Sequence, residues 1–109
     1  MGRHMIFIES PAFTEDVKRS LTDESYANLQ LHLAEYPFAG DLIRGTGGLR
    51  KVRWASGGKG KSGGVRVIYY WAVKAERLLM LLIYAKTEQA DLTPSQVAIL
   101  RRIVEEEYP

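Results

Sequence analysis

Two glycine-rich segments constrain the fold of this chain more than any other feature of its sequence. Eight of the ten glycines lie between positions 45 and 64, in the segments 45–48 and 57–64. Glycine weakens helices and strands but accepts turn conformations that other residues avoid. We therefore expect both segments to be loops. The stretch between them, Leu49–Ser56, alternates in character and is expected to be a strand.

Capping signals predict three helices. A serine or threonine followed by proline is typical of a helix start, because the hydroxyl accepts a hydrogen bond from a free N–H and proline fits the first turn. Such a pair precedes the segments that begin at Pro11 and Pro94, and Gln96 completes a capping box in the second. Apolar residues then recur at helical spacing. We expect helices over 11–19, from Thr22 to the residue before Pro37, and from Pro94 onward.

Strand signals lie before the first helix and after the second glycine-rich segment. Residues 5–9 form a short apolar run, 65–73 is rich in β-branched and aromatic residues, and 78–85 follows a polar turn. The predicted order is β-α-α-β-β-β-α. We expect an α+β fold in which the three later strands form a curved antiparallel sheet, joined by the first strand, with an N-terminal helical hairpin packed on it and a C-terminal helix.

Length and residue types limit what the chain can be. Its 109 residues suffice for one domain, placed at 5–109, and residues 1–4 precede a second methionine and are expected to be an expression-tag remnant. The absence of cysteine suits a reducing cytoplasm. The longest apolar run, Leu78–Ala85, is too short to span a bilayer. No metal-binding or nucleotide-binding motif occurs. We expect a cytoplasmic domain with no cofactor, no metal and no membrane contact.

Charge is unevenly distributed along the chain. The net charge is only +2, but the segment 44–66 contains no Asp or Glu. It carries seven cations, namely Arg44, Arg50, Lys51, Arg53, Lys59, Lys61 and Arg66. Cations on an exposed strand often serve only solubility and edge protection, and from the residues alone this interpretation is favoured. The alternative is a surface that binds phosphate groups.

The period of the strands predicts a cluster on one side of the sheet. Lys51 and Arg53 share a face, Tyr84 and Lys86 share a face, and Arg66 lies on the strand between them. Such a set suits RNA cleavage, in which the 2′-hydroxyl attacks the adjacent phosphate. The enzyme then has to align the groups, move two protons and stabilise charge on the phosphate, without needing a metal. The only histidine outside residues 1–4 is expected on a helix surface.

Three sequence blocks resemble a known family. They are Gly45–Arg53 (GTGGLRKVR), Gly63–Tyr70 (GGVRVIYY) and Ile83–Glu88 (IYAKTE). In this order they are similar to HigB-type toxins of the RelE superfamily, and the similarity covers nearly the whole chain after Met5. The resemblance implies the RelE-like fold and the toxin of a type II toxin-antitoxin system. It further implies an endoribonuclease that cuts mRNA in the ribosomal A site and a cognate antitoxin that is often a helix-turn-helix DNA-binding protein.

The resemblance also implies roles for single residues. The expected catalytic residues are Lys51, Arg53, Arg66, Tyr84 and Lys86, and we expect Arg50, Lys59 and Lys61 to contact RNA. The sequence departs from RelE itself in having Thr87 where an arginine occurs and in lacking a tyrosine near Leu92. The assignment of general acid and general base therefore stays open. A ParE-like toxin that inhibits DNA gyrase and a non-catalytic RNA-binding module are the alternatives, since a fold alone does not decide function.

Overall fold

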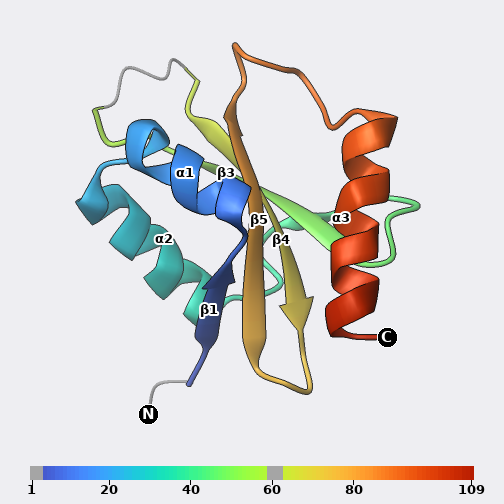
Figure 1. The fold of residues 1–109 in the computed structure, drawn as a ribbon. Helices are drawn as coiled ribbons and strands as arrows, with labels where there is room; N and C mark the ends of the chain where they lie inside the picture. The colour runs from blue at the N-terminus through green and yellow to red at the C-terminus, as the bar shows by residue number, and fades with distance from the viewer. Residues whose placement is uncertain (1–3, 59–62) are drawn as a thin grey trace.

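The computed structural model describes residues 4–58 and 63–109, in which five strands form one sheet (Figure 1). The strands are β1 (Ile6–Glu9), β2 (Asp41–Leu42), β3 (Leu49–Trp54), β4 (Val65–Ala72) and β5 (Arg77–Ala85). Their order across the sheet is β1-β5-β4-β3-β2. Strand β1 runs parallel to β5, and the other neighbours are antiparallel. The predicted α+β class and the predicted strands are confirmed.

Strand β2 was absent from the predicted order. It consists of two residues that pair with Lys51 and Arg50 of β3, and both of its side chains are exposed. Two exposed residues give no periodic signal, because alternation needs a longer run to be recognised. The observed order of elements is therefore β-α-α-β-β-β-β-α, with this short strand at the edge of the sheet.

Helices cover both faces of the sheet. The helices α1 (Pro11–Ser20) and α2 (Asp23–Glu35) pack on one face, and α3 (Pro94–Glu107) packs on the other (Figure 1). Each predicted cap is formed, with Ser10, Thr22 and Thr93 accepting hydrogen bonds from the third backbone N–H that follows. The capping box of Thr93 and Gln96 is also present. None of the described helices combines the length and the apolar character that crossing a bilayer requires.

A β-bulge in the middle of β5 changes which face of the sheet its alternate side chains occupy. Tyr69 pairs with Met80 and Ile68 pairs with Leu82, so Leu81 is an extra residue on its strand. Before this point Leu78 and Met80 face α1 and α2. After it, Tyr84 belongs to the hydrophobic cluster under α3. The bulge therefore places Tyr84 on the α3 side, because one extra residue exchanges the two faces of a strand.

Candidate active site

Three predicted site residues form one row across the sheet. Arg53 of β3 pairs with Arg66 of β4, and Arg66 pairs with Tyr84 of β5. Side chains of directly opposed residues in an antiparallel pair lie side by side on the same face. Lys51 lies on this face too, because it is two residues before Arg53 on β3. The sheet thus brings together four of the five predicted catalytic residues on its α3 side.

Arg66 lies deepest among the cations of the row. Its exposed fraction is 8%, whereas Arg53 is exposed. The guanidinium Nη1 of Arg66 is 3.4 Å from the carbonyl oxygen of Gly63. A Cβ added at Gly63 would lie 3.7 Å from the Cδ of Lys86, so Lys86 passes over the same glycine. Lys86, the fifth predicted catalytic residue, therefore lies near Arg66, since both side chains approach Gly63.

The cations line a polar hollow in the α3 side of the sheet. Its volume is about 590 Å³, and its walls include Lys51, Arg53 and Arg66. The remaining walls come from Ala39, Asp41, Val52 and Ala90. Three cations around an open hollow suit an anionic group such as a phosphate, because charge-assisted hydrogen bonds to arginine and lysine are strong.

Lys51 forms the ion pair of the site. Its Nζ is 3.1 Å from Oδ1 of Asp91, which lies in the loop between β5 and α3. The side chain of Lys51 is 34% exposed and that of Asp91 is 76% exposed. A pair this open to solvent contributes little to folding stability. Asp91 is therefore better considered as part of the electrostatics of the hollow than as a structural residue.

Tyr84 is buried beneath the ion pair. Its exposed fraction is 4%, and its hydroxyl has no hydrogen-bond partner within the described part of the chain. Burial raises the pKa of Tyr84, the positive charges of Lys51 and Arg66 lower it, and the negative charge of Asp91 raises it. The net shift is upward, so the hydroxyl keeps its proton at neutral pH. An unsatisfied buried hydroxyl is uncommon, and a catalytic role is one of its known explanations.

Arg50, one of the three predicted RNA-contacting residues, does not join this row. Arg50 lies on the opposite face of β3, where its Nη1 donates to the carbonyl oxygens of Phe38 and Gly40 at 3.2 and 2.8 Å. These bonds hold the segment before β2. Lys59 and Lys61 lie outside the described residues. The predicted RNA contacts of all three remain predictions.

Asp91 is the residue of the site that the sequence analysis did not select. It is separated from Lys51 by 40 positions and lies in a loop, where no periodicity assigns a direction to its side chain. The one available signal was its place between Lys86 and the capping box at Thr93. In residues 4–58 and 63–109, no three His, Asp or Glu side chains gather closely enough to hold a metal ion.

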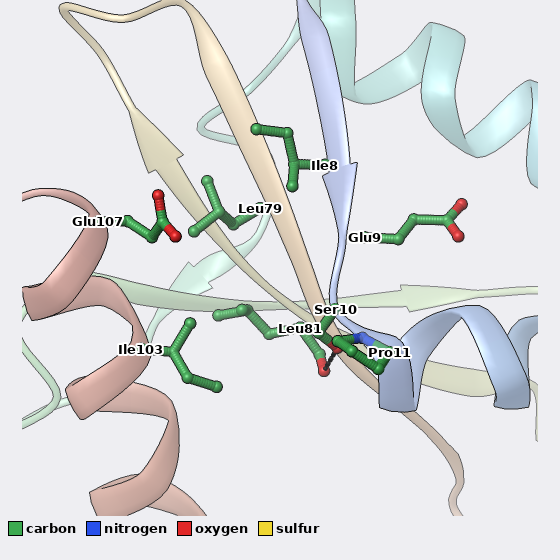
Figure 2. A pocket seen from close by; sticks show the side chains of 8 residues that line it. All are labelled: Ile8, Glu9, Ser10, Pro11, Leu79, Leu81, Ile103 and Glu107. Carbon is green, nitrogen blue, oxygen red and sulfur yellow. Dashed lines mark hydrogen bonds between the residues drawn. The ribbon is translucent and has the colours of Figure 1, made fainter.

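A second hollow between β1 and α3 has a different chemistry. Its volume is about 260 Å³, and its walls include the apolar side chains of Ile8, Leu79, Leu81 and Ile103 (Figure 2). The hydroxyl of Ser10 at its end donates to the carbonyl oxygen of Leu81 at 2.8 Å. The charged residues near it, Glu9 and Glu107, are acidic. This hollow does not suit a phosphate group, so the basic row is the better candidate site.

The chain is similar to known proteins both in sequence and in structure. Residues 14–107 match the model of the family described as RelE toxin of the RelE/RelB toxin-antitoxin system. The structure is similar to that of a double arginine-to-alanine mutant of the E. coli toxin RelE in the free state, with a TM-score of 0.61 and 13% sequence identity. The similarity covers 92% of this chain and 98% of the RelE chain. At this identity, the structural match supports a shared fold.

Proposed function

This chain belongs to the RelE family of toxins from toxin-antitoxin systems, and we propose that it is a ribosome-dependent endoribonuclease that inhibits translation by cutting mRNA. The observation that carries the proposal is the row of Arg53, Arg66 and Tyr84, with Lys51 beside it, along a polar hollow. We further propose that it belongs to the HigB-like branch, which rests on the three sequence blocks around Lys51, Arg66 and Tyr84.

The proposed reaction uses the 2′-hydroxyl of the RNA as the nucleophile. Arg66 and Arg53 would bind the scissile phosphate, since a guanidinium stays charged and can donate to two phosphate oxygens. As negative charge develops on the phosphate, cations already fixed around it stabilise the transition state more than the ground state. Lys86 at the exposed edge of the site would reach the departing oxygen, and Tyr84 would support the bound nucleotide from below.

The proposed biological setting follows from the family. A cognate antitoxin, expected to be a helix-turn-helix DNA-binding protein, would neutralise the toxin in the cytoplasm, and the substrate would be mRNA in the ribosomal A site. A requirement for the ribosome agrees with the openness of the site. Arg53 and Asp91 are exposed, and no lid covers them in the described ranges 4–58 and 63–109. An open site depends on its surroundings to hold the RNA in a reactive geometry.

Primer extension on transcripts from cells that express the chain tests the proposal. The wild-type chain should produce cuts at fixed positions within codons, and Arg66→Ala should remove them, because the loss of one transition-state donor costs on the order of 100-fold or more in rate. Arg77→Ala is the matched control, since Arg77 is an exposed arginine at the distant end of the same antiparallel strand pair.

Two results would contradict the proposal. Uncut transcripts together with an SOS response would favour the gyrase-inhibiting alternative. Full cleavage by Arg66→Ala at normal expression would mean that the active site lies elsewhere. Equal loss in Arg66→Ala and Arg77→Ala would indicate a general effect of lost charge on RNA binding instead of a specific role of Arg66.

A further inference from the structure

Each of the five predicted catalytic residues either carries a positive charge or has a proton to donate. Lysine and arginine side chains ordinarily carry their protons at neutral pH. The hydroxyl of Tyr84 keeps its proton as well, because burial raises its pKa. Cleavage through the 2′-hydroxyl nevertheless requires a group that accepts the proton of that hydroxyl. The predicted set contains no carboxylate and no histidine, although these side chains commonly accept such a proton.

Asp91 brings a carboxylate to the predicted set. Its Oδ1 lies 3.1 Å from Nζ of Lys51, and its neighbour Ala90 forms part of the wall of the hollow. With 76% of the side chain exposed, the second carboxylate oxygen is open to a substrate. Asp91 also acts electrostatically on Tyr84, which shows that it lies close to the row.

The loop that carries Asp91 is held in place by the start of α3. The amide Nε2 of Gln89 donates to the carbonyl oxygen of Asp91 and to Oε1 of Gln96, both at 2.9 Å. The same oxygen of Gln96 accepts from the backbone N–H of Thr93 at 2.9 Å, as part of the capping box. The cap of α3 thus fixes the backbone on both sides of Asp91, which is the kind of support that a catalytic group needs.

Asp41 is a second carboxylate and forms part of the wall of the hollow, but its contacts differ from those of Asp91. It lies on the edge strand β2, and its negative charge raises the pKa of Tyr69, whose side chain packs in the cluster under α1 and α2. Its cross-strand neighbour is Lys51, yet the ion pair of Lys51 is formed with Asp91. Asp91 is therefore the better candidate for a group that acts on the α3 side.

We infer that Asp91 accepts the proton of the 2′-hydroxyl in the cleavage reaction, an inference that rests on the proposed function. The O2′–H bond breaks as the O2′–P bond forms, and the proton goes to the carboxylate of Asp91. The P–O5′ bond breaks, and the departing oxygen takes a proton from the ammonium group of Lys86. The products are a 2′,3′-cyclic phosphate and a 5′-hydroxyl. Solvent then removes the proton from Asp91 and returns one to Lys86.

The test measures single-turnover cleavage of mRNA in the A site of a programmed ribosome. Asp91→Asn keeps the size of the side chain but cannot accept the proton, so the maximal rate should fall about 100-fold or more. Its affinity for the ribosome complex should stay equal or rise, because a negative charge near RNA is removed. Added formate should restore part of the rate of Asp91→Ala, with chloride at equal ionic strength as the control. Glu105→Gln, an exposed residue of α3, is the charge-matched control variant.

Each outcome has a defined meaning. If wild-type protein leaves the mRNA intact, both the proposed function and this inference fail. If wild-type protein cuts and Asp91→Asn cuts within a few-fold of it, only the role of Asp91 is overturned. The same holds if Asp41→Asn, and not Asp91→Asn, loses cleavage. A loss in Asp91→Asn without rescue of Asp91→Ala by formate would make Asp91 a positioning residue for Lys51 and would overturn its assignment as the proton acceptor.

Discussion

The cations on the two faces of strand β3 have different kinds of partner. On the α2 side, Arg50 donates to two backbone carbonyl oxygens, and the neighbouring Trp54 donates to the carbonyl oxygen of Ser25 at 3.0 Å. On the α3 side, Arg53 is exposed, and Lys51 forms an ion pair with the solvent-exposed carboxylate of Asp91. A cation that donates to backbone carbonyl oxygens supports the fold, whereas a cation that lines the hollow is available to a ligand.

The comparison also applies to the tyrosines of the two faces. Tyr69 on the α2 side donates to the carbonyl oxygen of Pro37 and accepts from the N–H of Gly40, both at 2.8 Å. Tyr84 on the α3 side is equally buried, but its hydroxyl lacks a partner among the described residues. The fold therefore uses the hydroxyl of Tyr69 for its own hydrogen bonds, in contrast to that of Tyr84.

The largest expected difference is between Arg53→Ala and Arg50→Ala. Arg53→Ala should lower the cleavage rate about 10-fold to 100-fold with little change in thermal stability, because an exposed cation near the phosphate is lost. Arg50→Ala should keep the maximal rate but lower the free energy of unfolding by about 1–2 kcal/mol, because two hydrogen bonds from a charged group are lost. Urea unfolding and single-turnover cleavage measure the two quantities. A loss of cleavage in Arg50→Ala together with a loss of stability in Arg53→Ala would refute the assignment of catalysis to the α3 side and of structural support to the α2 side.

A smaller effect is expected from Tyr84→Phe. Removing a buried hydroxyl without a partner should leave the free energy of unfolding unchanged or raise it by up to about 1 kcal/mol. If the hydroxyl is retained for the reaction, the cleavage rate should still fall, by about 10-fold. Tyr69→Phe is the contrasting variant and should be destabilised with its rate intact. Unchanged cleavage by Tyr84→Phe would show that only the ring of Tyr84 is used.

The smallest expected effect is a loss of stability in alkali. The pKa of Tyr26 is raised far above its usual value by burial and by its hydrogen bond to Glu9. A group whose pKa is higher in the folded state stabilises the fold below its unfolded pKa, near 10, and this contribution is lost as the pH rises above that value. Stability should therefore decline above about pH 10. Tyr26→Phe should decline less steeply, and an equal slope in both proteins would contradict this assignment.

The sequence predicted every element except β2, because each of the others had a local signal. The caps at Ser10, Thr22 and Thr93 set the starts of the helices, and the alternation in β3 separated Lys51 and Arg53 from Val52 and Trp54. The glycine-rich segments marked the loops around that strand. These signals depend on neighbouring residues in the chain, so one sequence suffices to find them.

The rest of the site depends on contacts between distant residues. The ion pair of Lys51 and Asp91 joins a strand to a loop, and the backbone acceptors of Arg50 lie 10 and 12 positions before it in the chain. The bulge at Leu81 is set by the packing of β4 against β5. Without it, the alternation in β5 would assign Tyr84 to the same face as Leu78 and Met80. No local pattern reports these features, since they arise only when the elements pack together.

The bulge also divides β5 into two halves in which the alternation of side chains between the two faces of the sheet differs. Before Leu81, the alternate residues Leu78 and Met80 face the core under α1 and α2, whereas after it Tyr84, which continues the same alternation, faces the side of Arg66 and the hollow. A substitution in the first half does not change which face the residues of the second half occupy, because that depends on the number of residues between them. A change of length does, since deleting one residue between Met80 and Tyr84 would exchange which face the chemistry occupies. The position of the chemistry therefore depends on the length of this strand.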